Sequence, residues 1–298
     1  MNHITKQTKA EMSMLIVAFI WGTSFVVVKN ALNDISPFTF LGLRFLLAFF
    51  TIYILAHKAF KDTDSSTIIH GCLLGFFLLF GYGTQTIGLQ YTTSSNAGFI
   101  TSLSVVLVPI IHCFSGGPMP SWKLILCVIA AGLGIFLIVF QHQNISLNLG
   151  DLLMLLCSFG FAFQLFFVGI YSPGHNPVTI TGVQLLFVGL SCSIIGIFLE
   201  KWPHYFSPLA ITSILVTSLL ATSLTFLAQM FMQPYSTSSR FALILTAEPI
   251  FAAAAAYFWA GETFTPQALI GATLIVTSMI ISIYARTDKQ VILIRNTP

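Results

Sequence analysis

Two charged side chains stand inside strongly apolar runs of sequence, and they are the first candidates for chemistry. Glu248 lies near the middle of the run 237–259, and Arg44 lies about seven residues into the run 38–56. If these runs cross a bilayer, each charge costs about 2.5 to 3.5 kcal/mol and should face a partner or a water-filled cavity. A carboxyl group withdrawn from water favours its protonated form, so Glu248 is a candidate proton carrier. Arg44 is a candidate for holding an anionic group of a substrate.

Both residues also have an architectural interpretation. Pro249 removes a helix hydrogen bond, and Glu248 could satisfy the backbone groups that such a break releases. Arg44 lies close enough to the end of its run to extend its guanidinium toward the membrane surface. Lys29, at the end of the first run, is expected to be an interfacial anchor. The residues alone therefore leave function and architecture open for both Glu248 and Arg44.

A second set of candidates consists of polar and aromatic side chains within other apolar runs. Amide groups in hydrocarbon require hydrogen-bond partners, which a substrate or a neighbouring helix can supply. We predict that these side chains line a central substrate-binding cavity, with bonding between helices as the alternative for each of them. The set consists of Trp21, Ser24, Tyr82, Gln85, Gln164 and Gln229.

The composition indicates that helices across a membrane must position these residues. The chain of 298 residues is 56% hydrophobic and 7% charged, whereas soluble domains carry about 25% charged residues. A spanning helix needs about 20 mostly apolar residues. We predict an all-α integral membrane protein with ten transmembrane helices, at approximately 13–32, 38–56, 67–89, 95–115, 122–140, 150–170, 177–199, 208–232, 237–259 and 266–284.

The positions of the 12 Lys and Arg residues predict the orientation. If the N-terminus is inside, only Lys29 and Lys201 lie on the outer side, and Arg44 lies within a span. The other nine then face the cytoplasm, as the positive-inside rule requires. We predict a multi-pass protein of the cell membrane with both termini in the cytoplasm. The nine residues are Lys6, Lys9, Lys58, Lys61, Lys123, Arg240, Arg286, Lys289 and Arg295.

One short motif occurs twice. Tyr91-Thr92-Thr93-Ser94-Ser95 begins the fourth run, and Tyr235-Ser236-Thr237-Ser238-Ser239 precedes the ninth, with four of five residues identical. Because five runs separate the copies, the second copy must be upside down relative to the first. Many secondary transporters use inverted repeats to build two packings that open alternately to the two sides. We predict two inverted five-helix halves, 1–144 and 145–298, the alternative being a chance match among Ser and Thr.

Several motifs together carry a family resemblance. The chain resembles the drug/metabolite transporter superfamily, EamA type, over nearly its whole length. The resemblance implies ten helices in a five-plus-five inverted arrangement and the movement of amino acids, nucleotide-like metabolites or amphipathic compounds, often as export. In one departure, Leu103-Ser104-Val105 stands where the second half has Ala247-Glu248-Pro249, so an ion site built on the glutamate is not duplicated. The motifs are Trp21-Gly22-Thr23-Ser24-Phe25 with Lys29, Arg44-Phe45-Leu46-Leu47-Ala48, Gly88-Leu89-Gln90-Tyr91-Thr92, Ala247-Glu248-Pro249 and Gly261-Glu262.

Other kinds of chemistry lack a signature in the sequence. The five cysteines are odd in number and show no CxxC spacing, which is typical of small buried side chains rather than of disulfides or a zinc site. We expect no metal, no cofactor and no catalytic residue. The basic residues are scattered, which argues against nucleic acid as a partner.

We therefore predict a secondary-active exporter of amino acids or similar small metabolites that works by alternating access, and not an enzyme. An intramembrane enzyme is the alternative, although neither a nucleophile with a base nor a metal site is recognisable. A passive channel is a weaker alternative. The expected partners are a small-molecule substrate, membrane lipids and a proton, and the sequence leaves a homodimer open.

Overall fold

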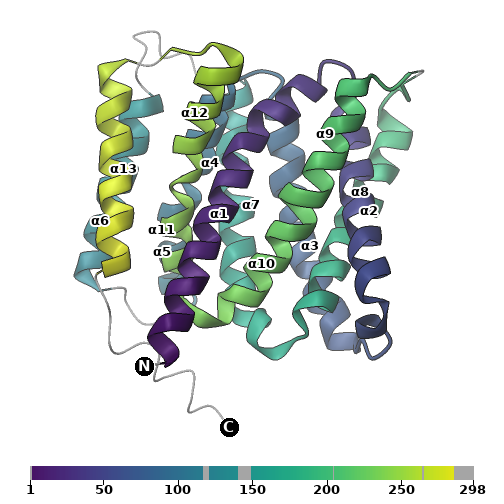
Figure 1. Ribbon diagram of the computed structural model, residues 1–298, viewed down its shortest axis with the longest axis horizontal. Helices are drawn as coiled ribbons and strands as arrows, with labels where there is room; N and C mark the ends of the chain where they lie inside the picture. Colours follow the sequence, from purple (N-terminus) through teal and green to yellow (C-terminus); the bar gives the residue numbers. More distant parts are fainter. Residues whose placement is uncertain (1, 117–120, 140–148, 204, 264, 285–298) are drawn as a thin grey trace.

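The computed structural model describes residues 2–116, 121–139, 149–203, 205–263 and 265–284, and this part of the chain is a bundle of helices without a strand (Figure 1). Three short 3₁₀ turns also occur, at His57–Phe60, Ser172–Gly174 and Gln233–Tyr235. The α-helices are α1 (Asn2–Ala31), α2 (Pro37–Ala56), α3 (Ser65–Gly88), α4 (Ser94–Thr101), α5 (Ser104–Phe114), α6 (Trp122–Val139), α7 (Leu149–Tyr171), α8 (Pro177–Leu199), α9 (Pro208–Ser218), α10 (Thr225–Met232), α11 (Ser238–Leu245), α12 (Glu248–Ala260) and α13 (Pro266–Tyr284).

The predicted fold class is confirmed. Within the described residues, eight helical stretches are long and apolar enough to cross a membrane, and two shorter apolar stretches, Ile125–Gly134 and Pro266–Ser278, lie in α6 and α13. These ten stretches match the ten predicted runs in order. Large side chains such as Leu55, Phe114 and Phe198 are exposed on the bundle, as a surface solvated by lipid requires. The chain is a multi-pass integral membrane protein.

Proline and glycine mark the ends of the helices. α2, α8, α9 and α13 each begin at a proline, which is favoured there because its missing N–H would lack a helical partner in any case. α12 ends at Gly261, whose φ of 67° is left-handed and therefore favours glycine. Residues 144 and 145, the predicted border between the halves, and Arg286, Lys289 and Arg295 lie outside the described residues.

The fourth and ninth spans are both broken, and at matching positions. α4 covers residues 94–101 and α5 begins at 104, while α11 covers residues 238–245 and α12 begins at 248, 144 positions later in each case. Both first segments start with a threonine cap. Thr93 Oγ1 accepts a hydrogen bond from the N–H of Asn96 at 3.1 Å, and Thr237 Oγ1 accepts one from the N–H of Arg240 at 3.3 Å. The repeated sequence motif therefore has the same local structure in both places.

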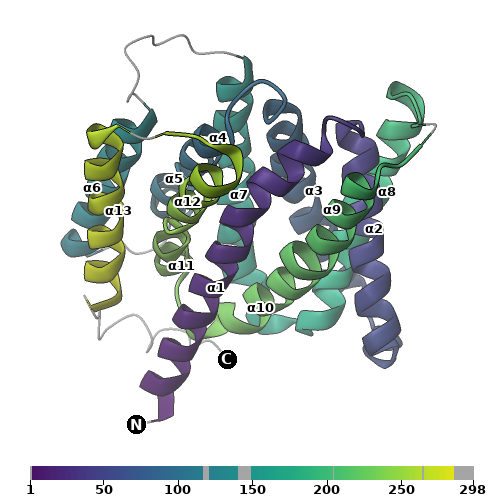
Figure 2. The ribbon, with the colours of Figure 1, turned by 45° about the horizontal axis from the view of Figure 1, so that its top comes forward.

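The two broken spans run antiparallel. Near its start α4 contacts the end of α12, because the hydroxyl of Ser95 donates to the carboxylate of Glu262. α1 runs alongside α11 and α12, and α7 runs alongside α4 and α5 (Figure 2). Gly22 permits the closest approach of α1, since a Cβ there would lie 2.4 Å from the backbone oxygen of Glu248. The break in the ninth span is therefore pressed against α1.

The eighth span contains a π-helical turn between α9 and α10, at Leu219–Leu224. Its widened turn places two hydroxyls opposite carbonyls five residues earlier. Thr222 Oγ1 donates to the oxygen of Thr217 at 2.9 Å, and Ser223 Oγ donates to that of Ser218 at 2.8 Å. Such turns are rare and occur often at functional sites. This one faces α1 and α2, in the middle of the bundle.

The remaining helices surround this centre. α2 packs against α8 and α9, and α3 packs against α7 and α8. α6 and α13 pack closely on each other and form a pair at one edge of the bundle in both views (Figures 1 and 2). The buried apolar side chains form one large cluster around α2, which includes Phe40, Phe45 and Leu78, and a second one around α5 and α11.

Candidate functional site

A cavity lies between the broken spans and their neighbours, and all eight predicted site residues line it. It encloses about 740 Å³ of empty space, a volume that includes the part open to solvent. Backbone positions at both breaks, including Ser102, Ser104 and Leu245, form part of its wall. The eight residues are Trp21, Ser24, Arg44, Tyr82, Gln85, Gln164, Gln229 and Glu248.

Arg44 is held inside the bundle and does not extend to the membrane surface. Its side chain is 2% exposed. Nε donates to Thr222 Oγ1 at 2.7 Å, and Nη2 lies 3.4 Å from the backbone oxygen of Ala221, both in the π-helical turn. The guanidinium carbon lies 4.9 Å from the ring centre of Tyr82. A guanidinium has five N–H donors, so Arg44 keeps donors for a molecule in the cavity besides those that bond to the π-helical turn and to Tyr82.

Glu248 is the opposite charge of the same cavity. It is the first residue of α12, at the break, and its side chain is half-buried. Within the described part of the chain its carboxylate makes no hydrogen bond and no ion pair. The side chain therefore does not perform the architectural role of satisfying the freed backbone groups. A carboxylate and a guanidinium line one cavity without pairing with each other.

The amide side chains divide into a pair and a single residue. Gln164 Nε2 donates to Gln229 Oε1 at 3.5 Å, and Gln229 Nε2 donates to Gln164 Oε1 at 3.4 Å. These long contacts join α7 to α10. The side chain of Gln85, on α3, makes no hydrogen bond within the described residues, although the residue is only 8% exposed. Its amide is therefore available to a molecule in the cavity.

Aromatic side chains shape the rest of the wall. Trp21 Nε1 donates at 3.0 Å to both the oxygen of Ala221 and Thr225 Oγ1, so its ring is fixed against the π-helical turn. Tyr82 makes edge contacts with Phe45 and Phe161. Ser24 Oγ donates to the oxygen of Trp21 at 2.7 Å within α1, so its hydroxyl is partly engaged by its own helix.

The comparisons agree with this architecture. The model of the EamA-like transporter family matches residues 8–140 and again residues 148–284. The chain belongs to the EamA-like transporter family. An uncharacterized transporter of Archaeoglobus fulgidus is 33% identical over 280 residues, 93% of this chain and 86% of that protein. The uncharacterized transporter YoaV of Bacillus subtilis is 23% identical over 296 residues, 95% of this chain and 99% of that protein.

A solved structure has the same fold. A crystal structure, described only as that of a protein, superposes with a TM-score of 0.74 at 12% identity, and the match covers 92% of this chain and 96% of the other. At that identity the likeness concerns the fold alone. Membership in the EamA family makes this chain a membrane transporter, and the two relatives above are both named as uncharacterized transporters.

Several residues of the candidate site were not predicted. Thr222 and the Ala221 carbonyl, which hold Arg44, lie in the π-helical turn, and Ser104 stands at the break where the other half has Glu248. The run of Thr and Ser at 222–225 was the signal for the first two, because hydroxyls in a span often bond to the backbone. Lys29 was predicted to be an interfacial anchor; its ammonium donates to the backbone oxygen of Thr92.

Proposed function

We propose that this protein is a secondary-active transporter that exports amino acids or similar small metabolites across the cell membrane by alternating access. The observation that carries the proposal is the pair of opposite charges, Arg44 and Glu248, which line one cavity and do not neutralise each other. Keeping two unpaired charges inside a membrane protein is costly unless a ligand or water meets them. A zwitterion would satisfy both.

The lining supports a small amphipathic substrate. Arg44 offers N–H donors suited to a carboxylate, and Glu248 offers an acceptor for an ammonium group. Gln85 adds an amide, and Phe161 and Phe226 supply apolar surface. This combination resembles the common plan of ligand sites, which are mostly apolar with a few placed polar groups. An α-amino acid with an apolar side chain has each of these features.

The antiparallel broken spans support alternating access. Inverted halves, which we place at 1–144 and 145–298, can exchange conformations and so open the site to either side. For substrate or proton to drive this change, each must bind the two conformations with different affinity. We assign the proton to Glu248, and we place both termini in the cytoplasm.

The experiment is transport by purified protein in liposomes. Vesicles loaded with one of a panel of amino acids should take up the labelled form by exchange, with saturation, at a rate that depends on an imposed pH difference. Vesicles of known protein orientation give the direction of net transport. Flux that neither saturates nor exchanges would indicate a channel. Conversion of a substrate in detergent, where no gradient exists, would indicate an enzyme. Either result would contradict the proposal.

A further inference from the structure

The residue before each threonine cap bonds to the other half of the molecule. Thr92 precedes Thr93, and its hydroxyl donates to Asp151 Oδ1 on α7 at 2.7 Å. Ser236 precedes Thr237, and its hydroxyl lies 3.4 Å from Glu11 Oε1 on α1. α7 and α1 are the first helices of the two halves. Equivalent positions of the repeated motif therefore contact carboxylates on equivalent helices.

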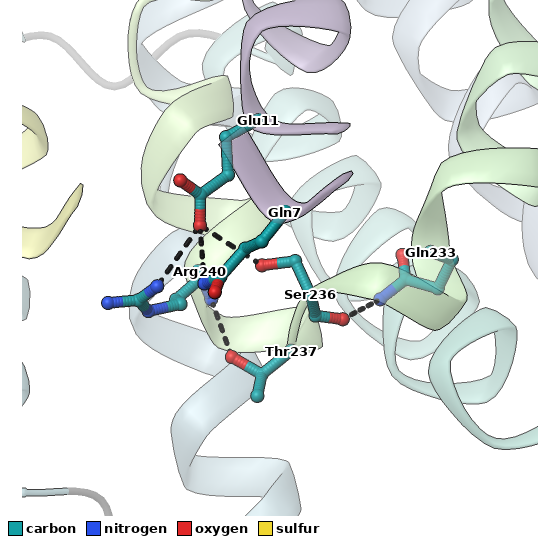
Figure 3. A network of polar contacts seen from close by, with 6 residues as sticks. All are labelled: Gln7, Glu11, Gln233, Ser236, Thr237 and Arg240. Carbon is teal, nitrogen blue, oxygen red and sulfur yellow. Dashed lines mark hydrogen bonds and ion pairs between the residues drawn. The ribbon is translucent and has the colours of Figure 1, made fainter. Parts of the chain in front are cut away.

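Glu11 lies in the first third of α1, so the contact around it is near the face of the bundle where α1 begins, here called the N-terminal face. Figure 3 shows this contact from close by. Three donors converge on Glu11 Oε1. Arg240 Nη1 is 3.1 Å away, Gln7 Nε2 is 2.9 Å away, and Ser236 Oγ completes the group. The side chains of Arg240 and Glu11 are only 11% and 7% exposed. This set, called the Glu11 latch, ties α1 to the start of α11.

The contact around Asp151 lies at the opposite face. Besides the bond from Thr92 to Asp151, the ammonium of Lys29 donates to the backbone oxygen of Thr92. Three residues after Thr92, the hydroxyl of Ser95 donates to the carboxylate of Glu262. This set, called the Asp151 latch, ties the start of α4 to α7 and to the end of α12. The two latches thus belong to opposite ends of the two broken spans.

The cavity lies between the latches. Along α1 its lining begins at Trp21 and continues to Val28, whereas Glu11 lies ten residues before Trp21. At about 1.5 Å per residue, roughly 15 Å of packed helix separates the Glu11 latch from the cavity. The lining also includes Leu89, at the end of α3 and close to Thr92. Access from the N-terminal face therefore requires movement of α1 away from α11, and the Glu11 latch opposes that movement.

We propose that the Glu11 latch and the Asp151 latch are the two gates of the transport cycle, each of which must break for the cavity to open at its own face. This inference rests on the proposed function. The repeat also shows how the gates differ. The position equivalent to Arg240 is Asn96, so the cation of the Asp151 latch is Lys29 of α1 and does not come from the repeated motif. In this structure the Glu11 latch is formed, and it closes the N-terminal face.

The experiment measures access to the cavity and needs no substrate. The five native cysteines are replaced by alanine, and Gln164→Cys introduces a reporter on the cavity wall. A membrane-impermeant maleimide is applied from either face of vesicles whose protein orientation is fixed by a terminal tag. We expect Glu11→Gln and Arg240→Ala to speed labelling from the N-terminal face about tenfold, because each variant leaves one buried charge without its partner.

Matched variants separate the latch from a general loss of packing. Asp64→Asn removes a carboxylate that caps α3 within the first half, and labelling should not change. The exchange Glu11→Arg with Arg240→Glu restores the ion pair and should return labelling to within about threefold of the parent. If neither single variant folds, Arg240→Lys, which keeps the charge, should give a smaller increase of the same sign. Unchanged labelling in the folded variants, or no rescue by the exchange, would overturn the inference.

Exchange measured on the same latch variants with Gln164 in place distinguishes this inference from the proposed function. If labelling becomes faster but no tested amino acid shows saturable exchange, the result supports the gates and contradicts the proposed substrate. Saturable exchange with unchanged labelling would retain the transporter and contradict the gates.

Discussion

The two broken spans have the same backbone but different charges, and this difference shows where the molecule departs from its internal repeat. Both spans start at a threonine cap and break after eight residues. Ser104 and Glu248 occupy the same place after the break, and both line the cavity. Asn96 and Arg240 occupy the same place after the cap. The repeat thus supplies two nearly equivalent frames, and at these two positions the ninth span carries ionisable side chains where the fourth span does not.

The second spans of the two halves also share a backbone frame and differ in charge, but here the first half carries the charged residue. α2 and α8 both begin at a proline, and Arg44 and Gln184 each stand seven residues later. Arg44 reaches the π-helical turn and bonds to it. Gln184 is fully buried, and neither its Nε2 nor its Oε1 has a hydrogen-bond partner within the described residues. α3, on which α8 packs, is a regular helix, so Gln184 meets no freed carbonyl there.

The largest expected effect on transport comes from removing the charge of Arg44, which the second half replaces by the neutral Gln184. Arg44→Ala should reduce amino-acid exchange by about 30-fold or more, because loss of one partner of a buried charge pair costs at least about 2 kcal/mol and every 1.4 kcal/mol is tenfold. Arg44→Lys should recover only part of the activity, since a lysine cannot bind a carboxylate with two parallel bonds. Exchange rates in liposomes at equal protein content measure both. Full activity of Arg44→Ala would exclude Arg44 from the site.

Glu248→Gln should abolish the response of transport to pH, because an amide takes up no proton in this range. Exchange at equal pH on both sides should persist at a reduced rate, because the ammonium group of the substrate loses its charged acceptor but keeps a neutral one. Adding Ser104→Glu to that variant should restore part of the pH response, because Ser104 lines the same cavity at the equivalent break. The measurement is the rate of exchange against pH in the parent and in the two variants. A pH profile of Glu248→Gln that matches the parent would remove Glu248 from proton coupling.

Gly22→Val should destabilise the protein, because its Cβ would lie 2.4 Å from backbone at the break of the ninth span. Overpacking of this kind costs about 1 to 3 kcal/mol. Gly83→Ala is the matched control, since the nearest atom to its Cβ would be 3.6 Å away. Thermal unfolding in detergent should show a lower midpoint for Gly22→Val only. Equal midpoints would mean that α1 can withdraw from α12 without cost.

The smallest expected effect is a gain. Gln184→Leu should raise the free energy of unfolding by about 1 kcal/mol, since it replaces a buried amide without partners by an apolar side chain. Gln164→Leu, in which the amide of Gln229 loses its partner, should lower it instead. Thermal midpoints of the two variants beside the parent test the contrast. A loss of stability in Gln184→Leu would show that its amide has a partner in the membrane.

The sequence predicted the spans and the cavity residues because both depend on polarity along the chain. Apolar runs of sufficient length specify spanning helices, and polar side chains within them tend to face inward. It did not predict the break after Thr101, because no proline lies there, while Pro109 lies inside the continuous helix α5. The partner of Arg44 also escaped prediction, because Thr222 is 178 residues away in the chain. Gln184 and Gln85 have the same side chain, but Gln85 lines the cavity and Gln184 does not. This difference depends on how the helices pack, which the sequence does not show.

One backbone oxygen atom in the π-helical turn is shared by side chains from two different helices, α1 and α2. The carbonyl of Ala221 receives the indole N–H of Trp21 from α1 and lies within reach of the guanidinium of Arg44 from α2. If α1 tilts and the indole moves away, the oxygen of Ala221 loses one donor. Arg44 can then form a shorter hydrogen bond to it. We therefore expect a movement of α1 to change the hydrogen bonds of Arg44, and with them the affinity of the cavity for an anionic group.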